Sequence, residues 1–374
     1  MIPFNKPYFS GNELKYIKQA VSNNKISGNG IFTEKSQLLL QEKYGFNKCL
    51  LTNSGTDALE MCALLCDIKL GDEVIIPSFT FVSTANAFAL RGANIKFADS
   101  SETNPNISVN SIKELISKKT KAIVIVHYGG IACDIKEIKK LCENNNILLI
   151  EDAAHSIDGY YNEIPLGSIG DFSAFSFHET KNIICGEGGM IVINNKKYIK
   201  QAEIIWEKGT NRVDFNRGKS NFYEWKDLGS SFLTSEISAA FLYAQLEKID
   251  KIQKKRKKIW DSYFQKLKNL VKENHLKFIE IPKYATQNYH LFCVLCNDSK
   301  TQKALLKYLN KNGVMAISHY KLLHNSEYFK DKYKGTELIN AQKYSDNLIR
   351  LPFFFELKET EILKICDLIN NFYK

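Results

Sequence analysis

The stretch FSAFSFHETKNIICGEGGMIVI, residues 172–193, places a lysine between two apolar runs. Phe172–Phe177 and Met190–Ile193 both have the apolar, β-prone composition of buried strands. Lys181 therefore follows the end of a strand and precedes the glycine-rich turn Gly186–Gly189. This position does not suit a solvated surface charge, but it suits an amine that reacts with a carbonyl cofactor.

Lys181 alone is a weak signal, because most of the 51 Lys and Arg residues of the chain must face solvent. The carbonyl cofactor that an enzyme lysine holds in this way is pyridoxal phosphate (PLP). A PLP site also needs an anion cradle for the phosphate, an acid beside the pyridine nitrogen and a flat group against the ring. The sequence holds a candidate for each of these three.

The candidate phosphate cradle is TNSGTDAL, residues 52–59. It follows the short apolar run Cys49–Leu51 and begins a helical pattern that continues through Leu65. The N–H groups at the helix start, the helix dipole and the hydroxyls of Ser54 and Thr56 would converge on an anion. An ordinary helix N-cap accounts for the same residues equally well.

The candidate acid is Asp152, which ends the apolar run ILLIED, residues 147–152. Ligands bind at the carboxyl ends of strands in open α/β sheets, and a carboxylate there would keep the pyridine nitrogen protonated. A helix N-cap is the alternative. The candidate flat group is Phe81, just beyond the strand Glu73–Ile76, although aromatic residues in such positions more often belong to the core.

The strand-like runs alternate with helical segments, which predicts a mostly parallel sheet wrapped by helices. After a long helical stretch from Ser235 to about Leu270, shorter strands and helices follow. We expect a large cofactor-binding domain, residues 1–248, and a smaller C-terminal α+β domain, residues 249–374, hinged near Lys248. The predicted strands are Glu73–Ile76, Asn94–Ala98, Ala122–Val126, Ile147–Ile150, Phe172–Phe177 and Met190–Ile193.

The order of these motifs along the chain resembles that of the DegT/StrS-type sugar aminotransferases. The resemblance covers essentially the whole chain. It is strongest to the members that make dTDP-4-amino-4,6-dideoxygalactose for bacterial surface glycans. The matching motifs are residues 54–56, 77–81, 151–155 and 176–189, and the longer specific runs are MIPFN (1–5), TFVSTANAF (80–88), FHETKN (177–182) and EKGTNR (207–212).

The resemblance implies a role for each candidate. Lys181 would form the Schiff base with PLP, and Asp152 would pair with the pyridine nitrogen. Phe81 would lie against the ring. His155 occupies a position that is often glutamine in the family and would lie near the ring hydroxyl. The phosphate would be bound by Ser54, Gly55, Thr56 and Ser176.

The resemblance also implies a homodimer in which both subunits contribute to each site. Ser231 stands where many members carry an asparagine that reaches the partner's cofactor phosphate, and its shorter side chain would make that contact through water. The expected sugar-nucleotide contacts lie near the two ends of the chain. For each histidine, an ordinary surface or core position is an equal alternative; the expected contacts are Gly28, Asn29, His319, Tyr320 and His324.

The fold implied is the aspartate-aminotransferase-like α/β fold, PLP fold type I, and the activity implied is transamination. L-Glutamate would donate the amino group, and dTDP-4-keto-6-deoxyglucose would accept it at C4 with galacto configuration. The gluco epimer and a 3-amino sugar remain alternatives. A sugar dehydratase of this fold would carry histidine in place of Lys181, and a non-catalytic regulator would be expected to lack Lys181 or Asp152.

Composition indicates an ordinary globular protein of 374 residues with 44% hydrophobic content. No basic leader precedes an apolar stretch and no apolar run reaches 18 residues, so we expect a cytoplasmic protein without a membrane span. Nine cysteines, odd in number and scattered in apolar runs, fit a reducing compartment. We expect the pairs Cys62/Cys66 and Cys293/Cys296 to be core residues and predict no metal site.

The formal net charge is +10, and residues 254–258 are all basic. They interrupt a helical apolar pattern that includes Ile252 and Ile259, so a solvated helix face is expected rather than a nucleic-acid site. A basic balance also helps to attract a dianionic sugar nucleotide.

Overall fold

The structure, a computed structural model, describes all residues from Met1 to Lys374. Its centre is a seven-stranded sheet in the order β1-β9-β8-β5-β4-β2-β3, in which only β9 runs opposite to the other strands. The predicted mostly parallel sheet is therefore confirmed. The strands are β1 Cys49–Thr52, β2 Glu73–Pro77, β3 Asn94–Ala98, β4 Thr120–Val126, β5 Leu148–Asp152, β8 Phe172–Ser176 and β9 Gly189–Ile193.

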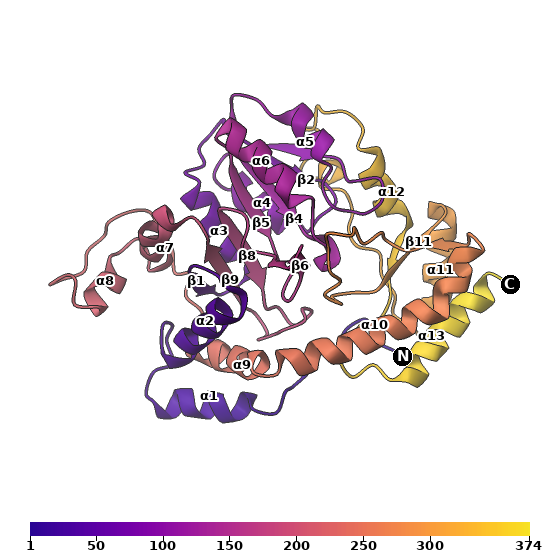
Figure 1. The fold of residues 1–374 in the computed structure, drawn as a ribbon, viewed down its shortest axis with the longest axis horizontal. Coiled ribbons are helices and arrows are strands. Elements are labelled where there is room, and N and C mark those ends of the chain that lie inside the picture. Colours follow the sequence, from indigo (N-terminus) through magenta and orange to yellow (C-terminus); the bar gives the residue numbers. More distant parts are fainter.

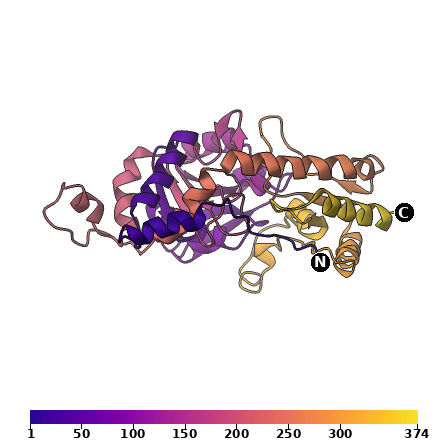
Figure 2. The same ribbon diagram turned by 90° about the horizontal axis from the view of Figure 1, so that it is seen from below.

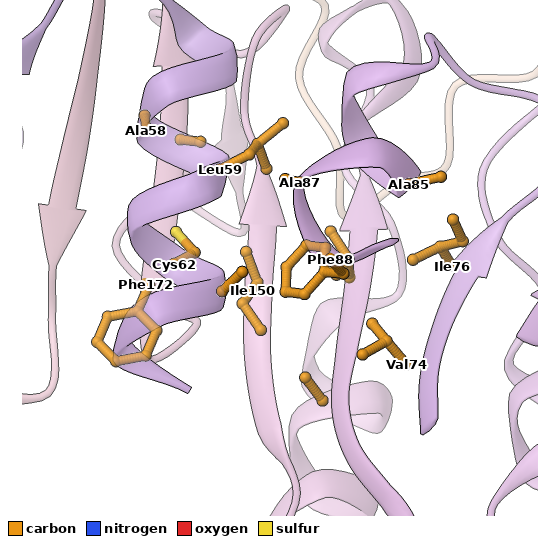
Figure 3. Close-up of a cluster of buried hydrophobic side chains, with 14 of the residues drawn as sticks. Ala58, Leu59, Cys62, Val74, Ile76, Ala85, Ala87, Phe88, Ile150 and Phe172 are labelled. Atoms are coloured by element: carbon orange, nitrogen blue, oxygen red, sulfur yellow. The ribbon is translucent and has the colours of Figure 1, made fainter. Parts of the chain in front are cut away.

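Helices cover both faces of this sheet (Figure 1). Because side chains alternate along a strand, Val74 and Ile76 of β2 pack into one core while Ile75 packs into another. Figure 3 shows the first of these cores, with α3 and α4 lying against the strands. Each buried Val, Ile, Leu or Phe contributes about 1.5–3 kcal/mol, so the central strands are held from both sides.

The helices over the face in Figure 3 are α3 Gly55–Leu65, α4 Ser83–Ala89 and α7 Ile199–Trp206. The opposite face carries α5 Val109–Leu115 and α6 Ile135–Asn145, with α1 Glu13–Ser22, α2 Ile31–Tyr44 and α9 Glu236–Leu246 over the strands at the β1 end. None of the helices is both long and apolar enough to span a membrane.

A second, smaller sheet lies in the C-terminal third, with the order β10-β11-β12. The long helix α10 runs beside α13 over this region (Figures 1 and 2). The N-terminus lies there too, since Ile2 packs into the same core and its N–H donates to the carbonyl of Gly313 at 2.7 Å. The elements are α10 Ile249–Lys272, β10 Leu276–Lys277, β11 Cys293–Cys296, α11 Ser299–Lys311, α12 Ile339–Asn347, β12 Leu348–Arg350 and α13 Glu359–Phe372.

The long helix expected from Ser235 to Leu270 is two helices, α9 and α10, with Lys248 between them. One correction concerns its basic stretch. Arg256 does not lie on the solvated face: it is buried, and its guanidinium donates to the carbonyls of Tyr289 and His290. The division of the chain near Lys248 stays a prediction.

A loop around the short helix α8, Arg212–Asn216, projects away from the body of the molecule (Figures 1 and 2). It carries large exposed side chains, among them Phe222 and Trp225, which are 63% and 78% exposed.

The four cysteines expected in the core are indeed buried. The remaining strands, β6 Tyr160–Tyr161 and β7 Ile164–Pro165, form a small hairpin.

Candidate active site

A cavity of about 570 Å³ opens where β5 and β8 end, and Lys181 and Asp152 both line it. A larger cavity, about 840 Å³, lies beside α4, α11 and α12 but contains no predicted site residue. The cavity at the strand ends is therefore the one that can hold the predicted chemistry. The predicted site residues that line it are Ser54, Gly55, Thr56, Phe81, Asp152, His155, Ser176, Lys181, His319 and Tyr320.

The turn between β1 and α3 forms one wall. Ser54 is the N-cap of α3, and its Oγ accepts the N–H of Asp57 at 3.0 Å, so the N-cap interpretation holds for this residue. A Cβ on Gly55 would lie 2.9 Å from the Cβ of Ser176, and one on Gly189 would lie 2.2 Å from the carbonyl oxygen of Ser54. The turn is thus packed against β8 and β9, with the N–H groups of α3 at the cavity.

Asp152 ends β5 and is only 6% exposed. Its carboxylate accepts the hydroxyl of Thr84 at 2.7 Å and the N–H of Ala154 at 3.2 Å. No helix follows it, so the alternative of a helix N-cap is wrong. Burial raises the pKa of Asp152 above its ordinary value, although both hydrogen bonds oppose this change.

Lys181 lies in the turn after β8, with its side chain partly exposed in the cavity. Its surroundings lower the pKa of its amine to about 8, chiefly through burial; the carboxylate of Asp152 opposes this change and the charge of Arg350 adds to it. A lysine with this pKa is partly neutral near pH 7, which is the form that attacks a carbonyl.

His155 stacks on His290, with ring centroids 4.1 Å apart. Burial holds the pKa of both imidazoles well below the ordinary value, so both are neutral at pH 7. The Nδ1 of His155 accepts the N–H of Gly129 at 3.2 Å, which places its proton on Nε2. His155 therefore offers the cavity a neutral N–H donor.

Phe81 is 54% exposed, which excludes the core alternative for this residue. Its ring lies 6.1 Å from that of Tyr320, and both line the cavity. His178 also lines the cavity, and its Nδ1 lies 2.9 Å from the hydroxyl of Thr180. An exposed aromatic ring at a cavity wall is a flat surface that a planar ligand can cover.

Four predicted residues do not line this cavity. The ring of His324 is buried, and its Nδ1 lies 2.7 Å from the hydroxyl of Ser78. It therefore connects its segment to the residue after β2 instead of facing a ligand. Gly28 packs against Leu233 and Thr234, and Asn29 lies beside it in the loop before α2. Ser231 is exposed, and its carbonyl accepts the side chain of Asn53.

Among the cavity residues that sequence reasoning missed are His290 and Arg350, which both come from the C-terminal region. His290 follows a stretch without regular structure, and Arg350 ends β12. Arg350 is only 6% exposed and donates from Nε to the hydroxyl of Tyr128 at 3.0 Å. An arginine amid apolar residues, as in LIRLPFFF (residues 348–355), is the signal that could have drawn attention to it.

A sequence model of the DegT/DnrJ/EryC1/StrS aminotransferase family matches residues 7–370. The chain belongs to this family. It is 30% identical to a GDP-perosamine synthase of Vibrio cholerae over 100% of this chain and 99% of that protein, and 29% identical to a GDP-perosamine synthase of Escherichia coli O157:H7 over 100% and 98%. This DegT-family chain is therefore a sugar aminotransferase.

Solved structures agree on the fold of this DegT-family chain. The aminotransferase TlmJ of Streptoalloteichus hindustanus superimposes with a TM-score of 0.91 at 24% identity, over 100% of this chain and 99% of that one. The putative sugar aminotransferase Spr1654 of Streptococcus pneumoniae, in its PMP form, also gives 0.91, at 22% identity over 100% and 99%. The predicted fold type I architecture is thus confirmed.

Aminotransferases of the DegT family use PLP, and the cavity residues fit this cofactor. The N–H groups of α3 meet the need for an anion cradle, and the buried carboxylate of Asp152 suits a protonated ring nitrogen. The amine of Lys181, with its lowered pKa, suits the cofactor's carbonyl. The enzyme is accordingly a PLP-dependent transaminase.

Proposed function

We propose that the enzyme transfers the amino group of L-glutamate to C4 of dTDP-4-keto-6-deoxyglucose and forms dTDP-4-amino-4,6-dideoxygalactose for surface-glycan synthesis. The observation that carries the aminotransferase chemistry is the lysine amine of lowered pKa in one cavity with the buried Asp152. The choice of sugar is supported by the long runs TFVSTANAF and FHETKN.

PLP, when bound, supplies a carbonyl that takes up an amino group and a ring that withdraws electrons. The residues of the chain would move the proton, place a charge beside the ring nitrogen and hold the ring. Nζ of Lys181 would take the proton from the donor's α carbon and hold it within the cavity. Asp152 would hold a negative charge beside the ring nitrogen, and the Nε2 proton of His155 would be available to the ring hydroxyl. Phe81 would lie against the ring.

The phosphate would be bound at the start of α3. Ser54, Gly55, Thr56 and Ser176 lie at this wall of the cavity, which supports that assignment. Thr56 Oγ1 lies 2.7 Å from the hydroxyl of Ser83, so a second hydroxyl stands beside the cradle. His319 and Tyr320 would contact the sugar nucleotide from the side of the C-terminal domain.

A GDP-linked sugar is the second candidate, since two relatives are named GDP-perosamine synthase. The two candidates share the cofactor site and differ in the nucleotide. The gluco epimer and a 3-amino product also remain alternatives, because the cofactor residues do not determine how the hexose lies over the ring.

The decisive experiment is to record the visible spectrum of the PLP-loaded enzyme before glutamate, after glutamate, and after each keto sugar. We expect glutamate to bleach the cofactor band and dTDP-4-keto-6-deoxyglucose to restore it, with NMR of the product giving C4 and galacto configuration. Recovery only with the GDP-linked keto sugar would move the assignment to that nucleotide. No response to glutamate would contradict the whole proposal.

We also propose a homodimer with shared sites, in the cytoplasm. The loop around α8 supports the dimer, because its Phe222 and Trp225 are large, exposed apolar side chains that a second copy would cover. Ser231, Gly28 and Asn29, which do not line the chain's own cavity, would then be available to the partner's site.

The dimer proposal predicts a mass twice that of the 42.8 kDa chain in sedimentation equilibrium. Trp225→Asp should raise the dimer dissociation constant by about 10-fold or more, because it places a charge in a buried apolar contact. Leu363→Asp on α13, a residue 48% exposed on the other domain, is the control and should leave the mass unchanged. A monomeric wild type, or equal effects of the two variants, would contradict the proposal.

A further inference from the structure

Two neighbouring buried acids end β5, Glu151 and Asp152, and their surroundings differ. An ionised carboxylate can accept about four hydrogen bonds. The groups around the carboxylate of Glu151, at 2.6–3.3 Å, are the N–H groups of Gly167, Ile169 and Gly170, the hydroxyl of Ser173 and Nε2 of His127. The fold itself therefore satisfies Glu151.

Asp152 has fewer donors. Its carboxylate accepts the hydroxyl of Thr84 at 2.7 Å and the N–H of Ala154 at 3.2 Å, which leaves it free to accept from a group in the cavity. Thr84 is the only side chain that donates to it, and it comes from another segment, α4. Thr84 is fully buried and does not line the cavity, so it can act on a ligand only through Asp152.

The hydroxyl proton of Thr84 has a fixed direction. An ionised carboxylate only accepts, so Thr84 must donate to Asp152. The hydroxyl of Thr80 lies 2.9 Å from that of Thr84, which has no second proton, so Thr80 donates to Thr84. Both threonines are buried. The two hydroxyls thus form a chain that ends on the carboxylate, and each bond polarises the next.

The turn before α4 also carries Phe81, whose ring lines the cavity. The N–H of Thr84 donates to the carbonyl of Phe81 at 3.2 Å. Thr84 is therefore bonded through its N–H to the segment of the exposed ring, and through its hydroxyl to the acid at the end of β5. One residue thus connects two groups that the cofactor would contact.

We propose that Thr84 is a positioning residue that keeps Asp152 ionised beside the cofactor's ring nitrogen. The inference rests on the proposed function, in which Asp152 is the partner of that nitrogen. Burial raises the pKa of Asp152, and the hydrogen bond from Thr84 opposes this change more than any other contact. Without that bond the carboxylate would bind a proton more readily and would compete with the ring nitrogen for it.

Thr84→Val removes the hydroxyl and nearly keeps the shape of the side chain. At about pH 5.5 we expect its dissociation constant for PLP to exceed that of wild type on the order of 10-fold, as for loss of a hydrogen bond to a charged group. The ratio should fall below about 3-fold by about pH 9, because an acid with a raised pKa ionises again at higher pH. A merely structural role would give a ratio that does not depend on pH.

The ratio isolates Asp152 from its titratable neighbours. Those that face it are Lys181 in the turn after β8, His127 after β4 and Cys62 of α3. All three are present in wild type and in the variant, so their titration affects both dissociation constants alike. Thr84→Ser, which restores the hydroxyl, should stay within about 3-fold of wild type throughout.

The ring nitrogen gives a second readout, because the ¹⁵N chemical shift of labelled PLP distinguishes a protonated from a neutral pyridine nitrogen. In the Thr84→Val holoenzyme the shift should move towards that of the neutral nitrogen, since the more basic carboxylate retains more of the shared proton. Thr80→Val should move it in the same direction by less, because Thr80 acts through Thr84. The inference therefore does not depend on the folding of one variant.

The matched control is Thr33→Val, which removes another buried hydroxyl that donates to a buried carboxylate, that of Glu236, outside the cavity. It should lower the melting temperature and leave the PLP dissociation constant and the ¹⁵N shift unchanged. A ratio independent of pH, an unmoved ¹⁵N shift in Thr84→Val, or equal effects of Thr33→Val would overturn the inference.

Asp152→Asn separates this inference from the proposed function. A normal PLP dissociation constant and ¹⁵N shift in Asp152→Asn would overturn the assignment of Asp152 to the ring nitrogen. Altered values in Asp152→Asn together with wild-type values in Thr84→Val would overturn the role of Thr84 alone. In the Asp152→Asn background, Thr84→Val should no longer change the ¹⁵N shift, because no carboxylate remains to take the proton.

Discussion

Lys181→Ala should lower turnover by on the order of 10⁴-fold or more, because the substitution removes the amine that holds the cofactor and moves the proton. The fold should be retained. Burial already disfavours the charged amine at this position, as its lowered pKa shows, so its removal costs the folded chain little. Steady-state transamination and thermal unfolding of the same preparations measure the two effects.

The matched control is Lys200→Ala, which removes an exposed lysine of α7. It should leave turnover and the melting temperature unchanged. Activity of Lys181→Ala within 10-fold of wild type would show that another group does the chemistry. Loss of folding in this variant would instead show that Lys181 is structural.

The pH dependence tests Lys181 without any substitution. An amine with a pKa of about 8 is neutral in about a tenth of the molecules at pH 7, whereas an ordinary lysine is neutral in far fewer. The rate at which the apoenzyme takes up PLP should therefore rise with pH and level off above about pH 8. A rate that kept rising towards pH 10.5 would show that the environment of Lys181 does not lower its pKa.

The fold could be predicted from the sequence because its signals are local. The run Ala122–Val126 is apolar throughout, as a strand buried on both faces must be, and it lies within β4, Thr120–Val126. Other features depend on contacts between distant segments. Helical spacing places Arg256 on the buried face of α10 with Ile252 and Ile259. Only the fold shows that the carbonyls of Tyr289 and His290 accept from its guanidinium.

The candidate site also contains residues that local sequence signals reveal and residues that only contacts between distant segments bring together. Asp152 and Lys181 lie directly after strands, and strand ends meet at one edge of the sheet, so their proximity follows from the pattern. Asp152 is also distinguished from its neighbour Glu151 by the alternation of side chains. Arg350 lies 169 residues beyond Lys181 by their numbers, in another sheet. Only the packing of the two regions brings it to the cavity.

Asp152→Asn should lower turnover on the order of 10²- to 10⁴-fold, since loss of one member of a buried charge pair costs about 3–5 kcal/mol. The substitution keeps the shape of the side chain, and the amide oxygen can still accept from Thr84. The lost feature is the negative charge that keeps the ring nitrogen protonated. Turnover and the dissociation constant of PLP are the measurements, and normal values of both would remove Asp152 from this role.

The stability of the apo form gives an independent test of Asp152. The expected change on substitution is no loss or a gain of stability, which a structural role would not produce. Burial raises the pKa of Asp152, so the charged carboxylate disfavours the apo fold above that pKa, and the effect disappears as pH falls through it. At pH 7 the apo form of Asp152→Asn should therefore be as stable as wild type or more stable. The increase in melting temperature on adding PLP should be smaller in the variant, because the stabilisation by a ligand grows with the logarithm of its affinity. A destabilised apo variant with an unchanged PLP effect would mean that Asp152 supports Thr84 and the fold instead of the cofactor.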